Sequence, residues 1–245
     1  MKKWSISAMK KYLFGVILFT FCAQISANSF NSKYSVLIEE NESSGWKNYY
    51  QNTLDITDPH RTLLLAHKYF KIENVTMGKA ADLGAGTGRD TLFLLKSGWQ
   101  VLSLDAEQLS IDIILNRVDA NQLPNLEVQV TSFSKMTLPP ELDLVNASFS
   151  LPFCNPNDFN QCWETIVDSI ADGGRFCGQF FGQEDEWANN PDLTIHTYEE
   201  VIKLFEPRFQ IEYLQIENGL LPCANGTMKH WHVYHVVAKK IINKI

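Results

Sequence analysis

The sequence predicts an α/β protein with one mostly parallel, seven-stranded sheet, helices on both faces and an antiparallel strand at the C-terminal end. Two patterns support this fold class. Between residues 58 and 205, short apolar runs typical of buried strands alternate with amphipathic segments typical of helices, an order that builds parallel sheets. The last two strand patterns, residues 209–216 and 230–239, follow each other without a helix, so we expect them to pair antiparallel.

Length and charge narrow the classes of protein and partner. The chain has 245 residues, 45% of them hydrophobic, which suffices for one sizeable core. We therefore expect one domain over residues 58–245, preceded by a lead-in or lid segment over residues 28–57. The net charge is −7, and Lys and Arg form no basic block interleaved with aromatic residues. A nucleic-acid partner is therefore disfavoured, and a small molecule or a protein side chain is the expected substrate class.

Residues 1–27 have the layout of a signal peptide for export. Lysines near the N-terminus precede an apolar run from Tyr12 to Cys22, and Ser26-Ala27 offers a small-residue cleavage point before Asn28. The run is shorter than the roughly 20 residues that a membrane span needs. We therefore expect cleavage and no stable membrane span in the mature chain; the alternative is an uncleaved anchor at the membrane surface.

Cleavage would place the mature chain in the periplasm or outside the cell. The alternatives are a cytoplasmic chain, a tethered chain whose domain faces the cytosol, and a start codon assigned too early. The predicted mature chain keeps an even number of cysteines, which permits two disulfides: Cys154, Cys162, Cys177 and Cys223. Cysteine and histidine do not occur at the spacing typical of metal sites, so we expect no metal.

Two features precede the first predicted strand. Trp46, Tyr49 and Tyr50 form an aromatic cluster that either covers the edge of the core or forms a lid over a ligand. Asp58-Pro59 has the pattern of a helix start, with Asp as N-cap and Pro at the first helical position. His60-Arg61 would then lie in the first turn of that helix, either near a ligand or at a solvated helix end.

The stretch from Lys79 to Asp105 predicts a cradle for a nucleotide cofactor. An apolar run ends at Asp82-Leu83, the turn Gly84-Ala85-Gly86-Thr87-Gly88 follows, a helical segment covers residues 89–97, and a second strand pattern ends on Asp105. Glycines allow a tight turn and a close ligand, and the free N–H groups at a helix start favour negative charge. A carboxylate about 20 residues beyond the glycines can accept both hydroxyls of a ribose. These features indicate a Rossmann-like βαβ unit for an adenosine-containing cofactor.

The position of the third glycine distinguishes between cofactors. The dinucleotide fingerprint requires a glycine at position 89, where this chain has Arg89. Here the third glycine is Gly88, and Asp82 stands two residues before the first. This Asp-x-Gly-x-Gly-x-Gly pattern resembles the class I S-adenosylmethionine (SAM) methyltransferases, and the following Arg89-Asp90 resembles the smaller bacterial members of the tellurite-resistance type. The resemblance implies that the turn backbone holds the methionine end of SAM and that Asp105 holds its ribose.

The remaining elements complete the predicted sheet. In chain order they are a helix over 107–117, strands over 126–130 and 142–149, a helix over 158–170, a strand over 175–181 and a helix over 197–205, before the two terminal strands. We expect Asp172-Gly173-Gly174 to end the helix that precedes it. Thr197 and Glu200 form a capping box, and residues 218–228 are expected to be a loop.

The resemblance also implies which residues bind SAM. They are Asp82, Gly84, Ala85, Gly86, Thr87, Gly88, Asp105, Ala106, Ser132, Phe133 and Asn146. Ser132 and Phe133 follow the third strand, where members of the family contact the adenine. Ser132 stands where many members have an acid, and Phe133 is expected either to stack on the base or to pack in the core.

The implied reaction is that of a methyltransferase (EC 2.1.1.-), which moves a methyl group from SAM to an unidentified small-molecule acceptor by in-line displacement. The protein then mainly positions the reactants and excludes water. A general base is needed only if the acceptor must lose a proton, and no catalytic residue is assigned; His230 and His232 either serve in this way or are structural. The alternatives are an NAD-dependent oxidoreductase and a non-catalytic exported protein that retains the SAM-binding fold.

Overall fold

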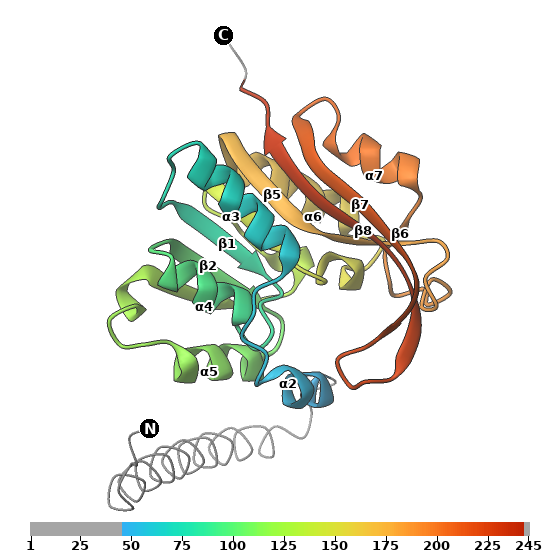
Figure 1. The fold of residues 1–245 in the computed structure, drawn as a ribbon, viewed down its shortest axis with the longest axis horizontal. Coiled ribbons are helices and arrows are strands. Elements are labelled where there is room, and N and C mark those ends of the chain that lie inside the picture. Colours follow the sequence, from blue (N-terminus) through green and yellow to red (C-terminus); the bar gives the residue numbers. More distant parts are fainter. Residues whose placement is uncertain (1–45, 243–245) are drawn as a thin grey trace, which may run out of the picture. The chain divides into compact units, whose positions relative to one another are not determined.

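The computed structural model describes residues 46–242, and its centre is one sheet (Figure 1). Seven strands lie in the order β3-β2-β1-β4-β5-β8-β7, and a short additional strand, β6, pairs with β5. β8 is antiparallel to both β5 and β7, whereas the other pairs are parallel. The predicted fold class is confirmed. The strands are β1 (Lys79–Leu83), β2 (Gln100–Asp105), β3 (Leu126–Val130), β4 (Leu142–Ala147), β5 (Ile170–Gly182), β6 (Ile195–His196), β7 (Phe209–Pro222) and β8 (Met228–Lys240).

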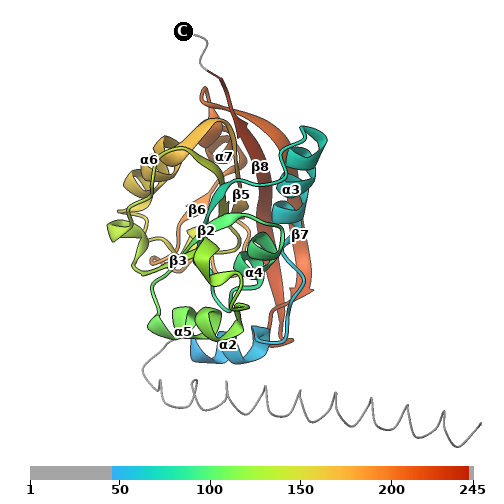
Figure 2. The same ribbon diagram turned by 90° about the vertical axis from the view of Figure 1, so that its left-hand side faces the viewer.

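Helices cover both faces of the sheet (Figures 1 and 2). The α-helices are α2 (Lys47–Thr53), α3 (Arg61–Ile72), α4 (Arg89–Lys96), α5 (Gln108–Arg117), α6 (Phe159–Ser169) and α7 (Tyr198–Phe205). Three 3₁₀ turns are η1 (Leu123–Asn125), η2 (Phe133–Lys135) and η3 (Leu151–Phe153). α3 and α4 pack on one face, and α6 and α7 pack on the other. Within residues 46–242, no helix is both long and apolar enough to span a membrane.

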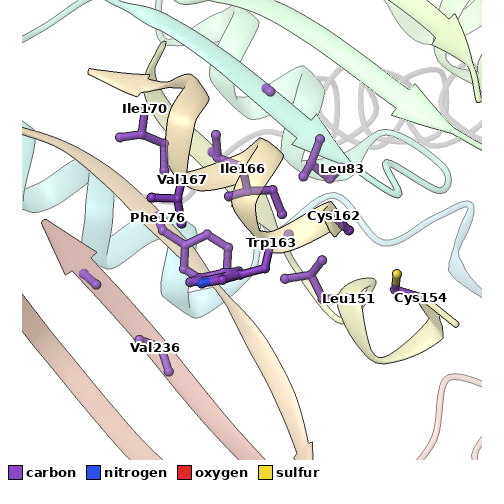
Figure 3. Packing of buried hydrophobic residues seen from close by; sticks show 14 of the residues in the cluster. Leu83, Leu151, Cys154, Cys162, Trp163, Ile166, Val167, Ile170, Phe176 and Val236 are labelled. Atoms are coloured by element: carbon purple, nitrogen blue, oxygen red, sulfur yellow. The ribbon is translucent and has the colours of Figure 1, made fainter. Parts of the chain in front are cut away.

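Two apolar clusters hold these layers together. On one face, Trp163 of α6 packs edge-to-face on Phe176 of β5, with ring centroids 5.1 Å apart (Figure 3). On the other face, Leu63 of α3, Leu94 of α4 and Val101 of β2 belong to one buried apolar cluster. The central strands are therefore buried on both faces, which explains why their sequences read as continuous apolar runs and do not alternate.

The first helix of the domain begins later than the Asp58-Pro59 pattern predicts. α3 begins at Arg61, and His60 before it has an extended backbone with φ −64° and ψ 147°. Tertiary contacts hold this segment: the Asp58 carbonyl accepts a hydrogen bond from Arg89 Nε, and the His60 N–H donates to Asp90. The prediction of an Asp58 N-cap is therefore wrong, because these contacts outweigh a local capping preference.

Two strand boundaries also differ from the predicted ones. α6 ends at Ser169 and β5 begins at the next residue, so Asp172-Gly173-Gly174 lies within the strand and not in a turn before it. Ile170 pairs with Leu142 and Arg175 pairs with Leu144, so a bulge contains the glycines. The terminal hairpin is longer than predicted, because β7 continues to Pro222 and β8 starts at Met228, within the predicted 218–228 loop.

The sheet order creates a switch point beside β1. β1 pairs with β2 on one side and with β4 on the other, so the chain leaves the carboxyl ends of β1 and β4 in opposite directions along the sheet. Open α/β sheets bind ligands at such a point. The predicted signal peptide and most of the predicted lead-in lie outside the described residues, so export and the domain division stay predictions. The cysteines at 154, 162, 177 and 223 are free thiols.

Candidate functional site

The glycine turn between β1 and α4 closes onto the end of β2. The N–H groups of Gly84 and Ala85 donate to the Leu104 carbonyl over 2.8 and 3.0 Å. The N–H of Gly86 donates to Asp105 Oδ2 over 2.8 Å. The two parts of the predicted cradle, glycines and post-strand acid, are therefore in direct contact.

The three glycines of the turn serve different purposes. A Cβ on Gly84 would lie 2.5 Å from Cβ of Ser150, and a Cβ on Gly88 would lie 2.6 Å from Cγ1 of Ile114. Close packing therefore requires glycine at these two positions. A Cβ on Gly86 would meet only a ring carbon of Tyr49, at 3.6 Å, although φ there is +57°. Gly86 is thus the glycine whose bare backbone faces open space.

Helix α2 contacts this cradle. The Tyr50 hydroxyl donates to Asp105 Oδ1 over 3.4 Å, and Thr87 Oγ1 donates to the Thr53 carbonyl over 3.4 Å. Burial and the nearby Asp105 charge raise the pKa of Tyr50, which keeps its hydroxyl protonated as a donor. Tyr49 lies beside Gly86. Of the two roles considered for the aromatic cluster, this position favours the lid.

A buried polar network lies directly beneath the turn. The Asn146 side-chain amide donates to Asp82 Oδ1 over 2.8 Å and to Asp90 Oδ2 over 2.9 Å. Thr91 Oγ1 donates to the second Asp82 oxygen over 2.6 Å, and Ser148 Oγ donates to Asn146 Oδ1 over 2.9 Å. Asn146 is fully buried and links β1, β4 and α4. It therefore organises the base of the site.

The two carboxyl groups of this network have different protonation behaviour. Burial, together with the charge of Asp90, raises the pKa of Asp82. Burial also acts on Asp90, but the charge and hydrogen bonds of His60 outweigh it and lower the pKa of Asp90. The negative charge of the network is therefore concentrated on Asp90.

A recess of about 300 Å³, mouth included, opens above the network. Its lining combines the turn, the start of α4, α2 and the segment before α3. The lining residues are Tyr49, His60, Asp82, Gly84, Ala85, Gly86, Thr87, Arg89, Asp90 and Ser148. This is the recess that the cradle pattern predicts at the carboxyl end of β1.

The remaining predicted SAM-binding residues do not line the recess. Gly88 caps α4, and Asp105 bonds to the turn. Ala106 is exposed, and Ser132 Oγ lies 3.2 Å from Ser134 Oγ. Phe133 is half-buried and packs against the main apolar cluster, in line with the core alternative. Contacts of these residues and of Asn146 with a cofactor stay predictions.

Aromatic rings continue from the recess toward the terminal hairpin. Phe149 lies 5.5 Å from the His60 ring and 5.9 Å from the Trp231 ring, between centroids. Trp231 lies 5.6 Å from Trp187. These two indoles enclose the buried Lys229, which pairs with Asp185 and lies 3.7 Å from the Trp231 ring centroid. The hairpin therefore supplies an apolar wall on this side of the site.

His60 and Asp90 form a pair that the sequence pattern did not reveal. The sequence places His60 near a predicted helix start and Asp90 within the family resemblance, and no pattern joins the two. Thirty residues separate them in the chain, and only the docking of α3 beside α4 brings them to 2.9 Å. A polar residue in the first turn after the glycines was the one local signal.

A family model described as "Tellurite resistance protein TehB" matches residues 44–176, more than half of the chain. A relative from Staphylococcus carnosus, described as an uncharacterized methyltransferase, is 26% identical over 148 residues, which are 60% of this chain and 69% of the relative. The crystal structure of TehB from Haemophilus influenzae has a TM-score of 0.62 at 16% identity and covers 79% of this chain; this chain spans 66% of that structure's chain.

Two further structures share the fold and were determined with S-adenosylhomocysteine (SAH) bound. A Burkholderia thailandensis 1,6-didemethyltoxoflavin-N1-methyltransferase has a TM-score of 0.57 at 18% identity, over 86% of this chain and 90% of that one. The N-methyltransferase NodS from Bradyrhizobium japonicum has a TM-score of 0.56 at 12% identity, over 82% of this chain and 90% of that one. At these identities the likeness establishes the fold.

Proposed function

The chain belongs to the TehB family of SAM-dependent methyltransferases, and we propose that it transfers a methyl group from SAM to a small-molecule acceptor by in-line displacement. The observation that carries the proposal is the backbone of Gly86. It faces the recess without a side chain, and its N–H is held by Asp105. A cradle of this kind admits a ligand close to the main chain.

The residues of the cradle fit the two ends of SAM. The N–H groups of Gly84, Ala85, Gly86 and Gly88 already bond within the protein, so the methionine carboxylate is assigned to the N–H of Thr87 and to the N–H groups at the start of α4. Asp105 accepts three hydrogen bonds, from Gly86 N–H, Glu107 N–H and the Tyr50 hydroxyl, and the longest of them is the Tyr50 bond at 3.4 Å. A ribose hydroxyl that replaces the Tyr50 donor would leave the cradle itself unchanged. Bound SAM would supply a methyl group activated by its sulfonium.

A small acceptor fits the surroundings of the recess and the charge of the molecule. The Phe149 ring packs on His60, which lines the recess, and Trp231 lies next to Phe149. The net charge of −7 disfavours a polyanionic substrate. The structurally similar methyltransferase from Burkholderia thailandensis was determined with 1,6-didemethyltoxoflavin bound, which supports a small-molecule acceptor here.

Calorimetric titration of the full chain with SAM and with NAD tests the cofactor. We expect saturable binding of SAM and SAH at one site and no binding of NAD, because Arg89 occupies the position of the third dinucleotide-fingerprint glycine. Release of SAH in a mixture of small nucleophiles then separates an enzyme from a binding protein. NAD binding without SAM binding would overturn the proposal, and SAM binding without any SAH release would restrict it to a binding role.

A further inference from the structure

His60 is fixed at the recess by two hydrogen bonds to one carboxylate. Its backbone N–H donates to Asp90 Oδ1 over 2.9 Å, and its ring Nδ1 lies 2.9 Å from Asp90 Oδ2. The His60 side chain is 16% exposed and that of Asp90 is 4% exposed. The Phe149 ring, 5.5 Å away between centroids, packs on the imidazole. The ring therefore has one defined position.

The carboxylate determines which ring nitrogen carries the proton. Asp90 also accepts from the Asn146 amide, so its oxygens act as acceptors throughout. An ionised carboxylate requires a donor opposite it, which places the proton on Nδ1. In the neutral imidazole Nε2 is then the nitrogen without a proton, and within residues 46–242 it makes no hydrogen bond. Because His60 lines the recess, Nε2 is the nitrogen available to a ligand.

Several ionisable groups surround the His60 ring. Arg89 of α4 donates through Nε to the Asp58 carbonyl. Burial and the charges of Arg61 and His60 lower the pKa of His235 on β8 to about 4, so His235 is uncharged at neutral pH. The charged or titratable groups near the ring are Asp90 and Arg89 from α4, Tyr49 from α2, Asp82 from β1, Arg61 from α3 and His235 from β8.

We infer that His60 is the general base of the methyl transfer and Asp90 its positioning residue, so that the acceptor is a nucleophile that carries its proton on oxygen, sulfur or nitrogen. The inference rests on the proposed function. As the acceptor heteroatom bonds to the methyl carbon, the methyl–sulfur bond breaks and its electron pair stays on sulfur. The acceptor proton passes to His60 Nε2 and then to water, and the Asp90 carboxylate stabilises the imidazolium meanwhile.

The test compares His60→Asn with His230→Gln in the full chain. Asn keeps an N–H donor toward Asp90 but has no basic nitrogen. His230 lies on the terminal hairpin, bonded to Asn218, and does not line the recess. The protonated probes are 2-mercaptoethanol, catechol and a primary alkylamine; the proton-free probes are iodide and dimethyl sulfide. SAM affinity is measured by calorimetry for each variant.

We expect the parent to methylate at least one protonated probe, with a rate that falls toward acid pH. His60→Asn should lower that kcat by about 10²–10⁴-fold, leave SAM affinity unchanged and remove the acid-side fall, whereas His230→Gln should match the parent. Any of four results would overturn the inference. The kcat of His60→Asn could equal that of the parent, or His60→Asn could lose SAM affinity and no kcat. His230→Gln could lose as much kcat as His60→Asn, or the parent could methylate only the proton-free probes. Failure to bind SAM would instead overturn the proposed function.

A second readout does not depend on turnover. Long-range ¹H–¹⁵N correlation spectra of the free protein should show His60 as the Nδ1–H tautomer, and Asp90→Asn should shift it toward Nε2–H because an amide nitrogen can donate to the ring. An Nε2–H tautomer in the parent would contradict the inference, as would SAM binding without methylation of any protonated probe.

Discussion

At the scale of single residues, the three glycines of one motif are required for different physical reasons. Gly84 and Gly88 are required by the side chains of Ser150 and Ile114, which leave no room for a Cβ. Gly86 has room for one, and only its positive φ and its place in the recess argue for glycine. The sequence motif predicts all three positions, but it does not separate packing from ligand access, because that depends on neighbours 26 to 66 residues away.

Gly86→Val tests ligand access directly. The substitution should abolish SAM binding, because its side chain would project into the recess from the cradle backbone. Gly226→Val is the matched control: φ is +81° there, nothing lies within 4 Å of a Cβ, and the position is in the β7–β8 turn. In both variants a valine in the left-handed backbone region lowers the free energy of unfolding by about 1–2 kcal/mol or more. Calorimetric titration with SAM compares the two variants. Tight SAM binding by Gly86→Val would show that SAM does not bind at the cradle.

At the scale of elements, local patterns were reliable where neighbours in sequence make the contacts. The capping box at the start of α7 is confirmed, because Glu200 N–H donates to Thr197 Oγ1 over 3.1 Å and Thr197 N–H donates to Glu200 Oε2 over 2.7 Å. The Asp58-Pro59 start failed because its segment bonds to α4, more than 30 residues away. The His60–Asp90 pair was missed for the same reason: tertiary docking has no signature at either residue.

The capping box supports a stability prediction. Thr197→Ala should lower the free energy of unfolding by about 1 kcal/mol, because it leaves the Glu200 N–H without its side-chain acceptor. Thr165→Ala is the control, since that hydroxyl bonds back to the Gln161 carbonyl inside α6 and caps nothing; it should change stability by less than about 0.5 kcal/mol. Urea denaturation followed by tryptophan fluorescence measures both. If both substitutions changed the free energy of unfolding equally, the capping box would add nothing, and the buried Val201 and Phe205 would account for the stability of α7.

At the scale of the whole molecule, one buried cation joins the start of the domain to its end. Arg175 on β5 has no exposed surface and bonds to Glu73, just after α3, and to Glu212 of β7. Hydrogen bonds from Arg175 lower the pKa of Glu73 to about 2, so the carboxylate stays ionised. These ion pairs connect the end of α3, the helix that follows His60, to the terminal hairpin. The sequence pattern predicted a strand over residues 175–181, but not that its first residue would be a buried cation with two carboxylate partners.

Buried histidines should make the whole fold sensitive to acid. Burial lowers the pKa of His196 to about 4, and Nδ1 of His196 has no hydrogen-bond partner among the described residues. Between about pH 6.5 and 4 the unfolded chain binds a proton at this site and the folded chain does not, so stability falls as pH falls through that window. The loss for this one group approaches about 3 kcal/mol.

His196→Leu should remove that loss while keeping the packing against Phe159 and Phe180. Urea denaturation at pH 7, 5.5 and 4 compares the variant with the parent. The two free energies of unfolding should diverge as the pH falls, with the variant the more stable at pH 4, because only the parent must keep His196 uncharged in order to fold. His235, whose pKa is also lowered to about 4 by burial, keeps part of the acid sensitivity in both proteins. Curves that stay parallel over this range would mean that the folded chain protonates His196 without cost.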